Sequence, residues 1–511
     1  MKTKRKWQVV FKPYATNQIM LLPPSLEELI DDKHPVRVVN QVIDKIDLEP
    51  LLKKFKGGGT SCYHPKMLLK VLVYAYLNNV YSSRRMEALV KESIPFMWLA
   101  GMNKPDHNTI NRFRSDKLKD VLKQVFKQIV LLLAEAGQVD LKELYLDGTK
   151  VDANANRYTF VWGNNIKTNK ERIRKQLNDL WDYAQSLAAE ELQDTSPVEF
   201  NEINPEKVSQ TIQKIDTALK GKPVDKKVKQ KLSYARRKWP QSLEKYQQQE
   251  ETLKGRKSYS KTDTDATFMR MKDDHMQNGQ LKPGYNWQIS TNNQIITNYT
   301  IHPSPNDTTT LIQHMEQHKE LYGHSPDVLT ADAGYGSQEN YEYLESNKIE
   351  AYVKYNYFHK EQKQKQQDPF NSQNFYYNPE KDCYYCPMGQ QILLVGQRKR
   401  TTENGFVQHS KIYQAQNCTG CPLRGMCYKS QGNRQIEVNH KLKQLKARAR
   451  EKLLSEKGIY HRKRRPADVE AVFGIIKGNH GFKRFLLKGK SKVEIEAGLI
   501  AIAHNLRKMV A

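Results

Sequence analysis

The chain has 511 residues, of which 83 are Lys or Arg and 56 are Asp or Glu, giving a formal net charge of +27 at pH 7. This excess of positive charge indicates a polyanionic partner, either nucleic acid or an acidic membrane surface. The sequence has no run of about 18 apolar residues, and its basic start, Met1 to Lys6, lacks the apolar stretch of a signal peptide. These features exclude a membrane-spanning protein and predict a cytoplasmic one.

Residues 1–140 are expected to form a helical N-terminal domain for DNA binding or dimerisation. Apolar spacing predicts helices over residues 67–77, 84–91 and 108–114. Asp106 is expected to cap the third helix, leaving Arg112 and Arg114 free to face outward. Three short helices are compatible with a helix-turn-helix module whose last helix enters the major groove. A plain helical bundle used for dimerisation explains the same pattern, and both interpretations stay open.

Two acids follow short apolar runs that are typical of buried strands. Leu144–Leu146 leads into Asp147 and a glycine, and Val328–Ala331 leads into Asp332. One such acid alone is often a turn residue that bonds its own backbone. Two of them favour a shared cation site. Asp152 is a nearby rival of Asp147, but no apolar strand precedes it.

A third acid lies on a helix predicted after residue 466. Helical spacing of i, i+3, i+4 and i+7 relates four apolar residues, Val469, Val472, Phe473 and Ile476. Glu470 lies beside this stripe, and Lys477 falls on the same face nearly two turns later. A buried acid needs a partner or a metal, and a salt bridge within this basic region is the alternative. Asp468 competes with Glu470, but the spacing to Lys477 favours Glu470.

The core between these motifs is predicted to be of the α/β class. Its order is three antiparallel strands, including a hairpin around Asn292 and Asn293, then a helix capped by Asp307, a strand, a helix and a strand. This is the order of an RNase H-like fold, a mixed sheet with flanking helices, in which the first and fourth strands are neighbours. Asp147 and Asp332 would then meet, and Glu470 would come from a helix packed across the sheet.

Two insertions are expected to interrupt this core. Alternating three- and four-residue apolar spacing in the first predicts a three-helix hairpin, and the second is polar and Cys-rich. The last part begins with a basic run that favours contact with DNA phosphates and ends in core helices that carry Glu470. The predicted units are core residues 141–154 and 256–358, a helical insertion at 155–255, a Cys-rich insertion at 359–440 and the C-terminal part at 441–511.

Five of the six cysteines lie within 45 residues: Cys383, Cys386, Cys418, Cys421 and Cys427. The two Cys-x-x-Cys pairs have zinc-ribbon-like spacing, because each offers two thiolates to one tetrahedral ion. In a reducing compartment such a cluster indicates metal before disulfides. We predict structural Zn²⁺, with the fourth ligand undetermined. The alternative is five reduced thiols that pack without metal.

The acidic motifs resemble those of DDE transposases. Leu-Asp-Gly-Thr-Lys at 146–150, Ala-Asp-Ala-Gly-Tyr-Gly at 331–336 and Val-Glu-Ala-Val-Phe-Gly-Ile-Ile-Lys at 469–477 are similar to the three motifs of that group. The nearest resemblance is to bacterial insertion-sequence transposases of the IS4/IS5 grouping, in particular the IS1182 family. It extends over nearly the whole chain, including the helical N-terminus and the Cys-rich insertion.

One part of the family signature differs in this chain. The IS4-type signature is Tyr, two residues, Arg, three residues, Glu, six residues, Lys. Glu470 and Lys477 fit, but Pro466 stands at the Arg position and Lys463 at the Tyr position. Three residues are candidates to replace them: Arg464, Arg465 and Tyr460.

The resemblance implies a DNA transposase that cleaves insertion-sequence ends and transfers them into target DNA. Asp147, Asp332 and Glu470 would be catalytic and hold two Mg²⁺ or Mn²⁺ ions, which prefer oxygen ligands. Lys477, with Arg464 or Arg465, would contact DNA phosphate.

The implied partners are double-stranded DNA, as terminal inverted repeats and as target, and a second subunit in a homodimer on DNA. The implied location is the bacterial cytoplasm, associated with the nucleoid. Two alternatives stay open: an RNase H-like nuclease without strand transfer, and a catalytically inactive, transposase-derived DNA-binding protein.

Overall fold

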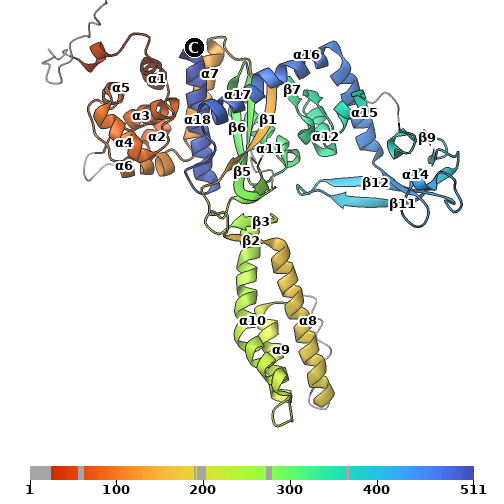
Figure 1. The fold of residues 1–511 in the computed structure, drawn as a ribbon. Helices are drawn as coiled ribbons and strands as arrows, with labels where there is room; N and C mark the ends of the chain where they lie inside the picture. Colours follow the sequence, from red (N-terminus) through yellow and green to blue (C-terminus); the bar gives the residue numbers. More distant parts are fainter. Residues whose placement is uncertain are drawn as a thin grey trace, which may run out of the picture.

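A computed structural model describes the chain in six stretches, residues 25–55, 62–188, 192, 203–271, 279–363 and 368–510. The basic start of the sequence, Met1 to Lys6, lies outside the described residues. A central sheet lies between a helical N-terminal part and a smaller second sheet, and a helical arm projects away from it (Figure 1). The chain is therefore of mixed α/β class, as predicted.

Six strands form the central sheet: β1 (Glu143–Asp152), β4 (Thr267–Arg270), β5 (Leu281–Asn292), β6 (Ile295–His302), β7 (Val328–Ala331) and β8 (Glu350–Val353). β5 is antiparallel to β1, β4 and β6, whereas β7 lies between β1 and β8 and is parallel to both. Leu146 on β1 pairs with Ala331 on β7. The prediction that the strands leading to Asp147 and Asp332 are neighbours is confirmed.

The predicted hairpin is the β5–β6 pair. It turns at Asn293 and Gln294, whose φ angles of 53° and 62° suit a two-residue hairpin loop. The helix after it, α11 (Leu311–Tyr322), ends at Gly323 with φ 80°, as predicted. The predicted cap on this helix is wrong. Asp307 begins a short 3-10 turn, and its carboxylate bonds to side chains of β5 instead.

Apolar side chains leave β1 on both faces, because strand residues alternate in direction. Tyr145 joins the core under α7 (Leu122–Glu135) and α18 (Lys490–Val510), whereas Leu144 and Leu146 join the core under α11 and α12 (Gln338–Ser346). The predicted closing helix is confirmed as α18, which is buried along most of its length. The predicted apolar stripe is also buried: Val469, Val472, Phe473 and Ile476 are at most 6% exposed.

The described N-terminal residues form α1 (Pro35–Asp44), α2 (Glu49–Leu52), α3 (Pro65–Leu77), α4 (Ser83–Glu92), α5 (Ile94–Leu99) and α6 (His107–Arg112). Asp106 caps α6 by accepting a hydrogen bond from the Thr109 amide at 2.8 Å, as predicted. The chain then continues as a π-helix, η2 (Phe113–Lys117). These helices share one continuous hydrophobic core with the central sheet, so the N-terminal part is docked rather than tethered.

Three helices form the arm: α8 (Gly163–Leu187), α9 (Pro205–Ala218) and α10 (Lys226–Leu253). They pack around a hydrophobic core of their own, which includes Leu177, Ile215 and Trp239. A small two-stranded sheet, β2 (Phe160–Trp162) and β3 (Ser258–Ser260), lies at the base of the arm. Figure 1 shows the arm extending away from the central sheet. The three helices predicted from alternating apolar spacing in the first insertion are therefore confirmed.

The second sheet is antiparallel and contains β9 (Tyr376–Asn378), β10 (Cys383–Tyr385), β11 (Gln391–Thr401), β12 (Val407–Ala415) and β13 (Gln435–Val438). A short helix, α14 (Arg424–Cys427), lies between β12 and β13. Two basic helices, α15 (His440–Leu454) and α16 (Glu456–Arg465), lead back to the central sheet. None of the helices in the described stretches combines the length and the apolar character needed to span a membrane.

Candidate active site

Helix α16 runs along β1 so that two pairs of side chains meet. Tyr145 and Asp147 share one face of the strand, and His461 and Arg465 share one face of the helix. The Tyr145 hydroxyl lies 3.0 Å from His461 Nδ1, and Arg465 Nη2 lies 2.9 Å from Asp147 Oδ1. The contacts fit together because two strand residues span about 6.6 Å and four helix residues about 6 Å.

Arg465 joins two of the predicted catalytic acids. Its Nη1 lies 2.5 Å from Glu470 Oε1, while Nη2 contacts Asp147. The side chains of Arg465 and Asp147 are only 4% and 10% exposed, whereas that of Glu470 is 49% exposed. Charge-assisted hydrogen bonds of this kind are strong, and a buried guanidinium needs such partners. Acids that lie 323 residues apart in the sequence are thus held by one cation.

A π-helical turn explains why Arg465 faces Glu470. Residues Pro466–Glu470 form a π-helix, η7, in which residues five apart share a face. Pro466 has no N–H to donate, so the regular α-helical bonding is interrupted at this point. The signature Arg stands four residues before Glu, whereas here Arg465 stands five before it. The extra residue in the turn compensates for the altered spacing.

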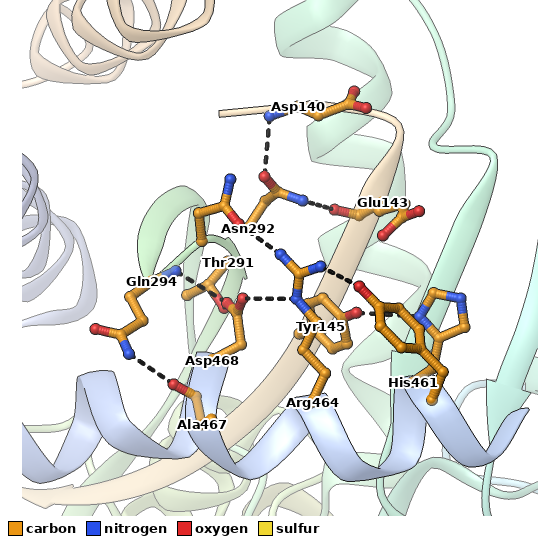
Figure 2. Close-up of polar contacts among 12 residues, drawn as sticks. Asp140, Glu143, Tyr145, Thr291, Asn292, Gln294, His461, Arg464, Ala467 and Asp468 are labelled. Atoms are coloured by element: carbon orange, nitrogen blue, oxygen red, sulfur yellow. Dashed lines mark hydrogen bonds and ion pairs between the residues drawn. The ribbon is translucent and has the colours of Figure 1, made fainter. Parts of the chain in front are cut away.

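Arg464 and Tyr460 belong to a different network, and Figure 2 shows Arg464 beside Asp468. Arg464 Nε lies 3.8 Å from Asp468 Oδ2, and its guanidinium also bonds the Tyr460 hydroxyl. Asp468 is 3% exposed and accepts hydrogen bonds from Thr291 Oγ1 at 2.6 Å and from the Gln294 amide at 3.1 Å. These hydrogen bonds to Asp468 hold the π-helical turn η7 against the β5–β6 hairpin. This role agrees with the choice of Glu470 rather than Asp468 as the site acid.

A fourth carboxylate, which sequence reasoning missed, lies beside the two strand acids. Asp332 follows β7, and its Oδ1 accepts a hydrogen bond from the Gly334 amide at 2.8 Å. A Cβ atom on Gly148 would lie 2.8 Å from Asp307 Oδ1, and one on Gly334 would lie 3.3 Å from Asp307 Oδ2. Asp307 thus lies between the glycine after Asp147 and the glycine after Asp332. Gly148 has no room for a side chain, because Gln288 Nε2 and Asp307 Oδ1 would lie 2.1 and 2.8 Å from its Cβ, and at Gly334 the space is tight.

Side-chain amides of β5 hold Asp307 in this position. Asn286 Nδ2 and Gln288 Nε2 donate to Asp307 Oδ1 at 2.7 and 2.9 Å. The hydroxyl of the buried Tyr335 donates to Gln288 Oε1. Burial, followed by the nearby carboxylates, raises the pKa of Tyr335 well above its ordinary value, so it remains a donor. In the sequence, polar residues alternate along the predicted strand at Asn286, Gln288 and Ser290, and this pattern could have indicated a buried polar site.

One lysine, Lys354, adds positive charge near these acids, whereas Lys477 lies further along β1, beside Lys150 and near Asp152. Lys354 lies just after β8 and is partly buried. Burial lowers the pKa of Lys354, and the positive charge of Arg465 lowers it further, whereas the carboxylates of Asp332 and Glu470 act in the opposite direction. Sequence reasoning missed this residue. Lys477 lies on the π-helical turn η8 (Ile475–Asn479), and its Nζ donates to the Lys150 carbonyl on β1 at 2.9 Å.

The expectation that Arg114 faces outward is wrong. Arg114 is 3% exposed, and its Nη1 donates to the Tyr76 hydroxyl at 3.1 Å and to the Tyr81 carbonyl at 2.7 Å. The π-helix η2 begins at residue 113 and changes which residues face the core. Arg112, which ends α6, is exposed as expected. Asp152, the rival acid, lies at the far end of β1, 3.9 Å from Arg157.

The donor set at this site suits a hard cation, because carboxylate oxygens are the ligands that Mg²⁺ and Mn²⁺ prefer. Within the described ranges, however, no three His, Cys, Asp or Glu side chains are arranged to hold a metal ion as they stand. Arg465 takes the place of a cation between Asp147 and Glu470.

Comparison with protein families gives two matches. Residues 385–510 match a transposase DDE domain, which includes Glu470 and Lys477, and residues 24–116 match the transposase domain DUF772, which includes α1 to α6. No curated protein and no solved structure matches the chain significantly. Both matches are to transposase domains, one toward each end of the chain, and together they support a DDE transposase of an insertion sequence.

Proposed function

We propose that this protein cleaves DNA at the ends of its insertion sequence and joins those ends to target DNA. The observation that supports this most strongly is the convergence of four segments. Asp147 lies in β1 just past its pairing with β7, and Asp332 follows β7. Asp307 lies next to Gly148 and Gly334, and Glu470 is linked to Asp147 through Arg465. The strand order, with β1 between β5 and β7, supports the RNase H-like core that this proposal assumes.

Asp147, Asp332 and Glu470 are the proposed ligands of two Mg²⁺ or Mn²⁺ ions. When bound, such ions activate water or a DNA 3′-hydroxyl and stabilise the leaving oxygen. The residues around them position these ligands. Arg465 orients Asp147 and Glu470, and Asp307 is held by the β5 amides next to both strand acids.

Phosphate binding is assigned to the basic side chains around the acids and on the helices that lead to them. Lys354, near Asp332 and Glu470, and Lys477, beside Lys150 on β1, are the proposed contacts to the DNA backbone next to the cut. The segment from residue 441 to 465, which forms most of α15 and all of α16, has eleven Lys or Arg and two acids. Exposed Arg112 is the proposed N-terminal contact.

The proposed partners are terminal and target DNA, with two subunits acting together because two ends must be joined. The proposed location is the nucleoid, where this DNA lies.

The test uses the full chain, Mg²⁺ and a plasmid that carries the DNA flanking this reading frame. Wild-type protein and Asp327→Asn should cut at the flanks and yield joined products, whereas Asp332→Asn should do neither. Asp327 is the matched control because it is exposed and lies at the opposite end of β7. Cleavage that survives in Asp332→Asn would show that other carboxylates act. Cleavage without joining would identify a nuclease, and binding without cleavage would identify a DNA-binding protein.

A further inference from the structure

Four of the five clustered cysteines line a single cavity of about 350 Å³. Cys386 comes from the turn between β10 and β11, Cys418 and Cys421 from the loop after β12, and Cys427 from the end of α14. Cys383 does not line this cavity. It is fully buried within β10, where it pairs with Asn378 on β9 and Leu393 on β11. The structure thus separates one thiol from the other four.

The loop that carries three of these cysteines has no apolar core. No residue from 416 to 433 is buried, and the nearby hydrophobic core contains only six buried residues. So small a core needs an additional link to hold a long loop in one conformation. Polar contacts supply part of it, since Arg424 donates to the Cys418 carbonyl at 2.8 Å and to the Gly432 carbonyl at 3.0 Å.

The thiols already lie among hydrogen-bond donors. The Arg434 amide donates to Cys418 Sγ at 3.4 Å, and Arg434 Nη1 donates to Cys427 Sγ at 2.7 Å. Arg434 itself is only 9% exposed, and its Nη2 donates to the Phe370 carbonyl at 2.7 Å. Both sulfurs therefore face N–H donors of the same residue, one from its backbone and one from its guanidinium. One buried arginine therefore faces two of the four sulfurs.

We propose that Cys386, Cys418, Cys421 and Cys427 bind one structural Zn²⁺ ion and that Cys383 is not a ligand. Four thiolates in a tetrahedron are a closed structural zinc site, with Zn–S distances of about 2.3 Å. Because no three of these side chains are arranged to hold a metal as they stand, zinc draws the four sulfurs together within the cavity. Each thiol releases its proton to solvent as its Zn–S bond forms. The ion then links the hairpin turn, the loop and α14.

Metal content of the full-length protein tests this assignment independently of any activity on DNA. Protein purified from zinc-supplemented cells and dialysed against a chelator should retain about one equivalent of zinc. Cys421→Ala should retain less than about a tenth of an equivalent, and Cys383→Ala should retain as much as the wild type. The two variants are matched because each removes one thiol of the cluster.

Limited proteolysis provides a second readout that does not depend on the stability of a variant. Removing zinc from the wild-type protein under stronger chelation should expose the 416–433 loop to cleavage and leave the central sheet intact. Three results would overturn the proposal: less than half an equivalent of zinc in the wild type, equal zinc loss from Cys383→Ala and Cys421→Ala, or an intact mass lower by four hydrogens, which indicates two disulfides.

Discussion

Replacement of Arg465 by Gln removes the cation that Asp147 and Glu470 share. Breaking a buried ion pair by removing one partner costs about 3–5 kcal/mol, because the other charge stays buried without compensation. Asp147 is the acid more affected by this loss, since its side chain is 10% exposed, whereas Glu470 is 49% exposed and regains hydration. We therefore expect a loss of about 3 kcal/mol in the free energy of unfolding without divalent metal.

Thermal melting in EDTA measures this loss. For a cooperative unit of about 150–250 residues, it corresponds to a fall in Tm of about 6–12 °C. Mn²⁺ should raise the Tm of Arg465→Gln more than that of the wild type, because a bound cation replaces the missing charge. The control is Arg464→Gln, which removes a neighbouring arginine 3.8 Å from Asp468. Asp468 is buried but keeps its hydrogen bonds from Thr291 and the Gln294 backbone N–H, so this loss should cost about 1 kcal/mol or less.

The double variant Arg465→Gln with Asp147→Asn isolates the coupling between the two residues. Once Asp147 is neutral, loss of the arginine leaves no buried charge uncompensated, so the double variant should be more stable than Arg465→Gln alone. The reasoning would be refuted by equal Tm losses in Arg464→Gln and Arg465→Gln, or by additive losses in the double variant.

Three further predictions concern single positions. Gly148→Ala would place Cβ 2.1 Å from Gln288 Nε2, whereas Cβ at Gly474 meets nothing within 4 Å. Gly148→Ala should therefore lower the free energy of unfolding by about 1–3 kcal/mol, and helical Gly474→Ala should raise it by about 0.5–1 kcal/mol. Thermal melting measures both, and the same change in Tm for the two variants would contradict this. Asp307→Asn should raise the Mg²⁺ concentration for half-maximal DNA cleavage by about tenfold or more, because the Asp307 carboxylate positions the metal ligands. An unchanged Mg²⁺ titration would show that Asp307 has no such role. Burial raises the pKa of Glu496 from 4.5 to about 7, so its contribution to stability is present below pH 4.5 and is lost as pH rises through 7, by about 3 kcal/mol. Glu496→Gln should therefore reduce the fall in Tm between about pH 5 and pH 8, and the same fall in both proteins would show that another group titrates.

The central sheet and the strands that lead to Asp147 and Asp332 were predictable because their signals are local, although β1 does not end at Asp147 as predicted but continues to Asp152. Leu144 and Leu146 alternate with Tyr145 and end in an acid, and the same pattern precedes Asp332. The pairing of the two strands followed from the order of elements, which fixes strand neighbours in a fold of this kind. The buried stripe beside Glu470 was predictable for a similar reason, since its spacing is that of a helix.

The parts that sequence reasoning missed depend on contacts between distant segments. Arg114 lies within one π-helical turn and Arg465 directly before another. Such turns shift the helix face by one residue, and the side-chain pattern does not reveal this shift. Asp307 has the sequence context of a helix cap, but its carboxylate instead accepts hydrogen bonds from the side-chain amides of Asn286 and Gln288 on β5. Whether an acid caps a helix or joins a site is decided by its tertiary neighbours.

The arm fixes a length over which this protein can act. Helix α10 has 28 residues and is therefore about 42 Å long. At 3.4 Å per base pair, this equals about 12 base pairs, more than one turn of duplex DNA. The separate core of the arm holds its helices together without support from the sheet. A molecule that contacts the far end of the arm is consequently held more than one DNA turn away from the end of the arm that joins the sheet. Shortening α8 and α10 together would bring that molecule closer by about 5.4 Å for each helical turn removed.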